Sequence, residues 1–248
     1  MSKVYADKIE PRNSNADVTI GASGQTVTLA GNDLRSNTVK DSGGNSLWTS
    51  DGSGNITLGA SAFQSNLRLI QTQTPSNVSS VDFTTGIDST YNVYIFTWIG
   101  VGPQDESAGG SKSVSFQGSV DSGLSFGVTA QQGVLGSHLH YDGASGTALT
   151  YETGYDVNNA AGRMYLGKEI EESAGGGNSC GEIWLFNPSS TSLVTLFQTT
   201  SVTRGTYGPA TFMTCGYFNT TSAINGITFL MADTGNVMDG KFKMYGLL

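Results

Sequence analysis

Two histidines spaced for one face of a strand are the clearest candidates for chemistry in this chain. His138 and His140 form an HxH pair, and side chains two residues apart on a β-strand point to the same side of the sheet. Such a pair suits either a metal ion or a sugar. A catalytic zinc also requires a third protein ligand, and Asp142 or Glu152 would serve only if the fold carried them to the histidines. Packed or solvent-facing histidines explain the pair without a ligand, so we predict no metal site.

The same part of the chain is rich in tyrosine, which can contact sugars. Tyrosines in or near this region are Tyr141, Tyr151, Tyr155, Tyr165 and Tyr207. An exposed tyrosine ring stacks on a sugar while neighbouring Asn and Asp side chains bind its hydroxyl groups. Each ring could equally belong to the core or to an interface. We keep a carbohydrate-binding hypothesis, with these candidate ligand contacts: His138, His140, Tyr141, Tyr151 and Tyr155.

No other residue pattern identifies an active site. Serines are frequent, but no G-x-S-x-G turn stands between a predicted strand and a predicted helix, and both histidines share one strand. The acids in residues 142–172 could supply the carboxylate pair of a polysaccharide depolymerase, yet nothing distinguishes one acid from another. The glycine-rich turns lack the lysine of a phosphate-binding loop. We therefore predict no catalytic residue, no cofactor and no enzyme activity, with a depolymerase as the less favoured alternative.

Two further features are predicted to be structural. The segment DGSGN at residues 51–55 is similar to the first half of a calcium loop, but the twelfth position, which requires a bidentate Glu, is Ala62. We predict a turn there. Cys180 and Cys215 lie in or beside predicted strands, and in a reducing compartment two buried free thiols are favoured over a disulfide.

The composition is typical of a protein built from strands and turns. Only 13% of the residues are charged, 34 are glycine, and Ser, Thr and Asn fill much of the remainder. Twenty acidic against twelve basic residues give a net charge of −8, which provides no electrostatic basis for binding nucleic acid or an anionic membrane. No window approaches the roughly 18 apolar residues of a membrane helix, and the opening residues lack the apolar core of a signal peptide. We expect synthesis in a cytoplasm without membrane insertion.

Residues 1–62 differ in kind from the rest of the chain. Short apolar pairs alternate with turns such as GASG, GND, DSGGN and DGSGN at a spacing of about nine to ten residues. The apolar positions are Val18, Ile20, Val27, Leu29, Leu47, Trp48, Ile56 and Leu58. Such short faces bury too little apolar area to fold alone. We therefore expect an N-terminal arm that either stacks on its copies, as a threefold β-prism or solenoid, or lies extended along a neighbouring chain.

Residues 63–248 are predicted to form an all-β, antiparallel, jelly-roll-like sandwich. The run YNVYIFTWIGVG at residues 91–102 alternates aromatic with β-branched residues, as in a central strand that is covered on both sides. Similar runs follow in the C-terminal half. The segments VSFQGSV and LSFGVTA predict two more strands joined at residues 121–123. Residues 131–177 predict two or three strands around long loops, where binding usually resides.

Several segments resemble virion proteins of tailed bacteriophages, especially marine and cyanobacterial phages with short tails. The segments are the opening MSKVYADKIEPRNSNADVTIG, the repeat TVTLAGNDLRSNTVKDSGGNSLW and the ending SAINGITFLMADTGNVMDGKFKMYGLL, and TGIDSTYNVYIFTW is similar to the family's central strand. The family has no agreed catalytic motif, so the resemblance implies no active-site residue. The chain departs from the family in its HLHYD segment and is short for a whole tail fibre.

The resemblance implies a structural role in a phage particle. We expect a homotrimer in which residues 1–62 attach to other virion proteins and residues 63–248 contact host-surface carbohydrate through loops, as in a tail-fibre component. The alternative is a capsid decoration or head-fibre protein that stabilises the head or projects from it. Either role implies a protein of the virion, assembled in the host cytoplasm.

Overall fold

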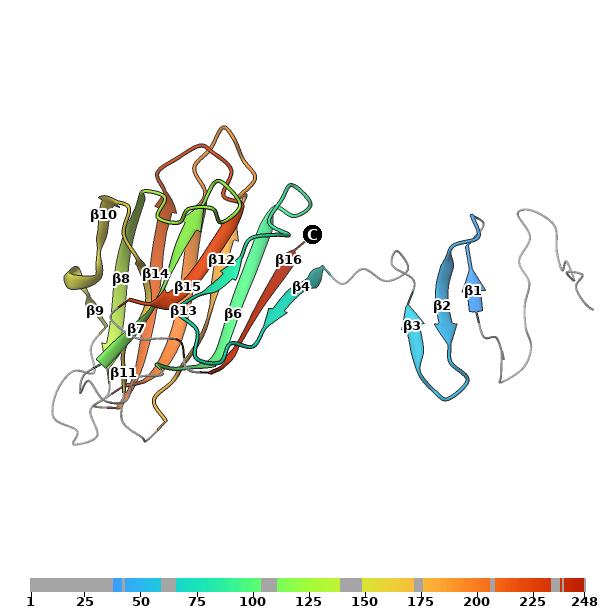
Figure 1. Ribbon diagram of the computed structural model, residues 1–248, viewed down its shortest axis with the longest axis horizontal. Helices are drawn as coiled ribbons and strands as arrows, with labels where there is room; N and C mark the ends of the chain where they lie inside the picture. Colours follow the sequence, from blue (N-terminus) through green and yellow to red (C-terminus); the bar gives the residue numbers. More distant parts are fainter. Residues whose placement is uncertain are drawn as a thin grey trace, which may run out of the picture. The chain divides into compact units, whose positions relative to one another are not determined.

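The computed structural model divides the chain into two units, Met1–Phe63 and Gln64–Leu248. It describes residues 38–41, 43–58, 66–103, 111–138, 149–171, 176–205, 208–232, 237 and 239–247. Within these ranges the regular structure is antiparallel β-strand (Figure 1), apart from a single 3-10 turn, η1, at Thr153–Tyr155. No helix in the same ranges is long and apolar enough to cross a membrane. The prediction of an all-β protein is confirmed.

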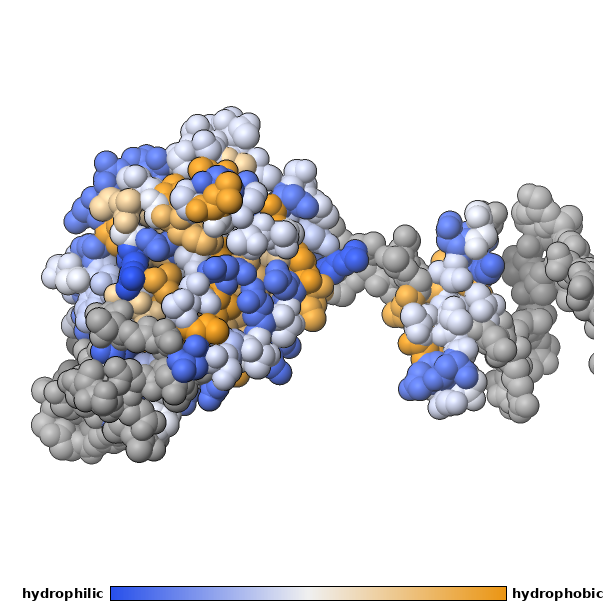
Figure 2. Space-filling model, viewed as in Figure 1, coloured by the Kyte–Doolittle hydropathy of each residue, from blue (hydrophilic) through white to orange (hydrophobic). Residues whose placement is uncertain are grey.

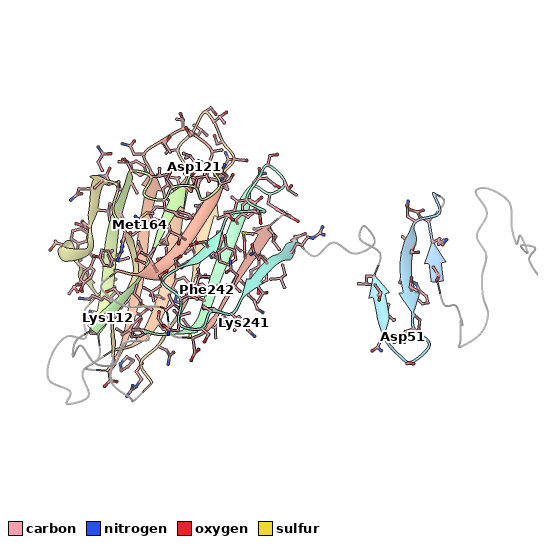
Figure 3. The ribbon with its side chains drawn as sticks, viewed as in Figure 1. Asp51, Lys112, Asp121, Met164, Lys241 and Phe242 are labelled. Carbon is pink, nitrogen blue, oxygen red and sulfur yellow. The ribbon has the colours of Figure 1, made fainter. Side chains whose placement is uncertain are left out.

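The described part of the N-terminal unit is a three-stranded antiparallel sheet. Its strands, in spatial order, are β1 (Thr38–Lys40), β2 (Ser46–Ser50) and β3 (Ile56–Leu58). Aspartates close both connecting turns. Asp41 Oδ1 accepts hydrogen bonds from two backbone amides of its turn, and Asp51 Oδ1 accepts from the amides of Ser53 at 2.7 Å and Asn55 at 3.2 Å (Figure 3). The predicted turn at residues 51–55 is therefore confirmed.

The larger unit contains two sheets of antiparallel strands that face each other. The first sheet has the order β4 (Leu67–Gln73), β16 (Lys241–Leu247), β6 (Val93–Val101), β12 (Ser179–Phe186), β13 (Leu196–Gly205), β14 (Gly208–Phe218) and β8 (Ala130–His138), with β9 (Thr150–Tyr151) and β10 (Val157–Ala160) paired to β8. The second has the order β5 (Val81–Phe83), β15 (Gly226–Met231), β7 (Ser111–Ser119) and β11 (Met164–Glu171). Because Ile170 of β11 pairs with Gly205 of β13, the sandwich is nearly closed into a barrel.

Aromatic side chains from both sheets form the core. Phe116 of β7 meets Phe197 of β13 with ring centroids 5.1 Å apart, and Phe229 of β15 meets Phe242 of β16 at 4.9 Å. Phe242 and Met164, both labelled in Figure 3, are fully buried in this core. Since burying one such side chain contributes roughly 1.5–3 kcal/mol, these contacts between the sheets hold the sandwich together.

The strand β6 is central, as its alternation predicted. It pairs with β16 on one side and β12 on the other. Tyr94, Phe96 and Trp98 are buried between the sheets, but on the opposite face only Ile95 is buried and Ile99 is 54% exposed, so the prediction that both faces of this strand are covered is wrong.

Small polar residues line the place where β11 approaches β13. Trp98 Nε1 donates to Ser179 Oγ at 3.0 Å, and Thr203 Oγ1 donates to the same oxygen at 3.4 Å. A Cβ atom at Gly167 would lie 3.0 Å from Thr203 Oγ1. The glycine therefore allows the close approach that nearly closes the barrel, and the Ser179 hydroxyl satisfies the buried indole N–H of Trp98.

One predicted strand is wrong. The segment LSFGVTA is irregular, because β7 ends at Ser119 and β8 begins only at Ala130. Asp121 accepts hydrogen bonds from the Ser119 hydroxyl and from the amide and hydroxyl of Ser125, and Gly123 has a φ of +85°. This turn network replaces the alternating backbone of a strand.

Candidate functional site: a tyrosine-lined groove

The groove lies on the outer face of the first sheet, where β14, β8 and β9 are neighbours. Side chains at even positions of β8, such as Gln132 and Val134, are buried, whereas those at odd positions face outward. The register places Tyr217 beside Gln131 and Cys215 beside Gly133, while β9 pairs with the next outward position of β8. Outward residues of three strands therefore meet on one surface.

The hollow on this surface has a volume of about 310 Å³. Tyrosine rings come from β9 and β14, and amides and small residues surround them. The lining residues are Gln131, Gln132, Gly133, Tyr151, Asn158, Cys215, Gly216 and Tyr217. A hollow of this size lies at the lower end of small-ligand sites, which combine aromatic walls with a few placed polar groups.

Tyr151 is exposed but held in one orientation. Tyr151 is 58% exposed to solvent. Its hydroxyl donates a hydrogen bond to Asp156 Oδ2 at 2.7 Å. This hydrogen bond raises the pKa of Tyr151 above its usual value, so the phenol stays protonated. The other oxygen, Asp156 Oδ1, is buried and has no hydrogen-bond partner among the described residues. Because Oδ1 is buried and Oδ2 already accepts from Tyr151, this carboxylate orients the exposed ring and does not itself face the hollow.

Tyr217 is a second oriented tyrosine. Its hydroxyl donates to Gln131 Oε1 at 2.5 Å, across the β14–β8 pair. Tyr217 is not among the predicted ligand residues, because it lies in a predicted strand far from the irregular region. The sequence pattern that indicates its position is alternation, because Met213, Cys215 and Tyr217 occupy every second position of β14 and lie on its outward face.

Gly133 forms the open floor between the two tyrosines. A Cβ atom built there would meet only the Tyr151 ring, at 3.7 Å, and its hydroxyl, at 4.0 Å, which are ordinary contacts. At Gly216, by contrast, a Cβ would lie 2.2 Å from the carbonyl oxygen of Gln131. Packing requires a glycine at 216 but not at 133. The absence of a side chain at 133 leaves the hollow open.

The other predicted ligand residues do not join Tyr151. His138 lies on the inner side of β8, its ring 5.3 Å from that of Phe212, and Tyr155 packs against the same small cluster. Side chains alternate between the two faces of a strand, and His138 is an odd number of positions from Gln131 and Gly133, so it points away from the groove. The structure therefore does not support the prediction that His138 and Tyr155 contact the same ligand as Tyr151. His140 and Tyr141 lie outside the described residues.

A charged pair stabilises this inner cluster. Lys168 Nζ lies 2.8 Å from Glu152 Oε2 and 4.8 Å from the centroid of the Tyr155 ring. His138 Nε2 is 3.5 Å from Glu152 Oε1. Burial is the largest single influence on Glu152 and opposes its ionisation, but the hydrogen bond and charge of Lys168, together with Thr150 and His138, outweigh burial and hold the pKa of Glu152 below its usual value. The arrangement is that of a packed ion pair.

The remaining chemical groups do not assemble into a catalytic or metal centre in the described ranges. Residues 177–181 read G-N-S-C-G, but Ser179 is fully buried in β12 and bonded to Trp98. No group of three or more His, Cys, Asp or Glu side chains with metal-binding geometry occurs among the described residues. Both cysteines are free, as predicted, but Cys215 is exposed and Cys180 half-buried. The prediction of buried thiols is therefore wrong, because both side chains lie on the outer face of the sheet.

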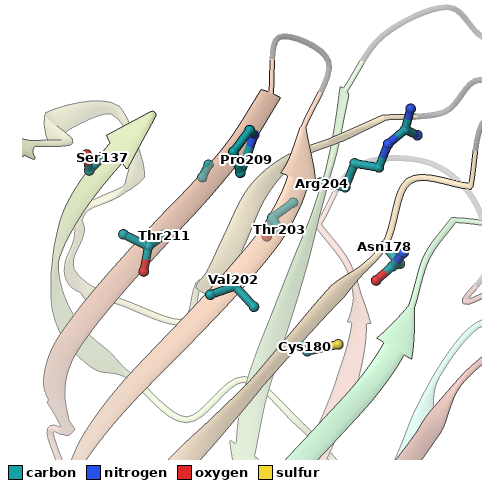
Figure 4. Close-up of a pocket in the computed structure, with 9 residues that line it drawn as sticks. Ser137, Asn178, Cys180, Val202, Thr203, Arg204, Pro209 and Thr211 are labelled. Atoms are coloured by element: carbon teal, nitrogen blue, oxygen red, sulfur yellow. The ribbon is translucent and has the colours of Figure 1, made fainter. Parts of the chain in front are cut away.

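A second hollow, of about 590 Å³, opens on the same outer face (Figure 4). Cys180, Val202, Thr211 and Ser137 line it from the neighbouring strands β12, β13, β14 and β8. Arg204 is the one charged side chain among its described lining residues, and it is paired with a glutamate 2.5 Å away. The other lining residues that the structure describes are small aliphatic, thiol, hydroxyl and amide side chains, and none of them is aromatic.

Comparison with protein-family models, with curated proteins and with solved structures finds no match to this chain. The groove must therefore be interpreted from its own geometry.

Proposed function

We propose that the chain is a non-enzymatic attachment protein whose sandwich binds a saccharide in the tyrosine-lined groove. The observation that carries the proposal is the pair Tyr151 and Tyr217, held on either side of the open floor at Gly133. Aromatic rings contact the apolar C–H faces of sugars, and amide and carboxylate groups bind their hydroxyls. Gln131 and Asn158 supply amide groups in the lining, and Asp156 orients the Tyr151 ring.

Charge favours a neutral sugar over a phosphate-bearing ligand. The chain has a net charge of −8, and none of the described lining residues of the groove is basic. Asp156, which fixes Tyr151, adds a carboxylate next to the groove. A nucleic acid or phospholipid headgroup would be repelled by this environment.

The resemblance to phage virion proteins suggests where this binding is used. In a tail-fibre component, the N-terminal unit would join the particle and the sandwich would contact host-surface carbohydrate. In a capsid decoration or head-fibre protein, the same groove would serve adhesion from the head. Electron microscopy of intact particles with a labelled antibody to the sandwich separates the two roles, because label at the tail supports the fibre and label over the head supports decoration.

Glycan binding tests the proposal directly. The full chain is applied to a printed array of bacterial surface glycans, and the strongest binder is titrated by calorimetry. Tyr151→Ala should weaken affinity at least tenfold, which corresponds to about 1.4 kcal/mol, whereas Tyr151→Phe, which keeps the ring, should weaken it less. The matched control is Leu124→Ala, at a residue 89% exposed in the turn after β7. Binding of no glycan by the unmodified chain, or equal affinity of Tyr151→Ala, would reject the proposal.

A further inference from the structure

Two hollows open on the outward face of the first sheet, and one row of side chains separates them. The tyrosine-lined groove includes Gly133 and Cys215, which pair directly between β8 and β14. The second hollow includes Ser137 and Thr211, another direct pair of the same two strands. Four positions along a strand span about 13 Å. An extended ligand can therefore reach both hollows, whereas a single sugar ring, similar in size to a tyrosine ring, cannot.

The row between the hollows is apolar and exposed. Tyr151 of β9 pairs with Leu135 of β8, and Leu135 pairs with Met213 of β14. Val202 of β13 lies diagonally next to Met213 on the same face, because it pairs with Thr211. The side chains of Tyr151, Leu135, Met213 and Val202 form what we call the apolar track. These residues are between 38% and 58% exposed.

The apolar track differs from the ordinary apolar surface of a protein. Single apolar side chains scattered among polar ones are usual at a surface, and Figure 2 shows such scattering over the larger unit. In the track, by contrast, four neighbouring strands each place an exposed apolar side chain beside that of the next strand. The line begins in the tyrosine-lined groove at Tyr151 and ends in the second hollow at Val202. It therefore connects the two hollows.

The second hollow contains polar groups in fixed orientations. The Thr211 hydroxyl donates to a backbone carbonyl oxygen of β13 at 3.0 Å, which leaves its oxygen lone pairs as acceptors (Figure 4). Asn178 Nδ2 donates to another backbone carbonyl oxygen at 2.9 Å. The charge of Arg204 is balanced by Glu171. Oriented hydroxyl and amide groups of this kind suit the hydroxyl groups of a neutral sugar.

We propose that the ligand of the tyrosine-lined groove is an oligosaccharide that continues along the apolar track into the second hollow. This inference rests on the proposed function, because it extends the same site. One sugar unit contacts the Tyr151 ring, and the next lays its apolar C–H face on Leu135 and Met213. A further unit presents its hydroxyl groups to Ser137 and Thr211. The second hollow therefore favours long glycans over short ones.

A series of glycans of increasing length tests the proposal on the full chain. The probes are the neutral glycan that binds most strongly on the array and its mono-, di-, tri- and tetrasaccharide fragments. By titration calorimetry, the tetrasaccharide should bind at least tenfold more tightly than the monosaccharide. In NMR spectra, the monosaccharide should shift the amide signals of Gly133 and Gly216, and the tetrasaccharide should also shift those of Val202 and Thr211.

Substitutions in the apolar track should reduce the ratio of the two affinities. Val202→Ser removes the apolar contact at the end of the track, and Met213→Ser removes the one in its middle, so each should bring the ratio closer to one. The matched control is Leu69→Ser, at a residue 50% exposed on the edge strand β4 of the same sheet, which should keep the ratio. A general loss of stability would weaken both glycans alike and leave the ratio unchanged.

The outcomes separate this inference from the proposed function. Equal affinity for all fragments, or a tetrasaccharide that leaves the Val202 and Thr211 amides unshifted, would overturn the extended site. If Tyr151→Ala still weakened binding in that case, the tyrosine-lined groove would stand. Binding of no glycan by the unmodified chain would reject both proposals.

Discussion

Replacing Gly133 by valine separates the binding role of the groove from the stability of the fold. Gly133 lies in the interior of β8, paired with Cys215, and a Cβ there meets only the ring and hydroxyl of Tyr151, at 3.7 and 4.0 Å. A glycine within a strand costs roughly 0.5–1 kcal/mol relative to alanine, and valine suits a pleated surface. The substitution should therefore leave stability unchanged or raise it by about 0.5–1 kcal/mol.

For a unit of this size, that gain corresponds to a rise in Tm of about 1–4 °C. The valine methyl groups would occupy the floor of the 310 Å³ hollow, so glycan affinity should fall at least tenfold. Differential scanning calorimetry and glycan titration measure the two effects on the same sample. The comparison variant is Gly216→Ala, whose Cβ would collide with a backbone carbonyl oxygen at 2.2 Å, and it should lower Tm.

Either of two results would refute the reasoning about Gly133. A fall in Tm of Gly133→Val comparable to that of Gly216→Ala would show that the space beside Tyr151 is not open. Unchanged glycan affinity with a higher Tm would show that the ligand does not occupy the groove.

Two further predictions concern the fold. Ser179→Ala should lower the free energy of unfolding by about 1–3 kcal/mol in urea titrations, because the buried indole N–H of Trp98 loses its acceptor; an unchanged midpoint would contradict this. The hydrogen bonds from the Ser119 and Ser125 side chains lower the pKa of Asp121 to about 2. Because this folded-state pKa is depressed, the stabilisation is present above the ordinary value of 3.8 and is lost as pH falls toward 2. Between pH 5 and 2, the Tm of Asp121→Asn should therefore fall less with decreasing pH than the Tm of the unmodified chain. An equal fall in Tm for both proteins would contradict the lowered pKa of Asp121.

Local patterns predicted the strands whose side chains alternate strongly. The aromatic positions 94, 96 and 98 identify β6 because the opposite sheet, including Phe229 of β15, covers the face on which they lie. The turn at Asp51 followed from the tendency of Asp to bind backbone amides two to four residues ahead. The segment after Ser119 misled the same reasoning, because hydrogen bonds from Ser119 and Ser125 to Asp121 stabilise a turn that alternation cannot reveal.

The candidate site was only partly accessible from the sequence. The polar residues near Tyr151 in the sequence predict a ligand contact, and Tyr151 lines the groove. Its partner Tyr217 is 66 positions away in the chain and reaches the groove through the pairing of β14 with β8. His138, which is predicted to contact the same ligand as Tyr151, faces inward. Which face each residue occupies depends on strand register, which arises from contacts distant in sequence.

The most direct test of the saccharide groove is an NMR titration of the isotope-labelled chain with the best-binding oligosaccharide. The readout is the change in chemical shift of each backbone amide. The account predicts that the amides of Gly133 and Gly216 shift with a common dissociation constant and that the Tyr151 signals follow them. Shifts confined to the second hollow, around Val202 and Thr211, or no shifts in the larger unit, would contradict it.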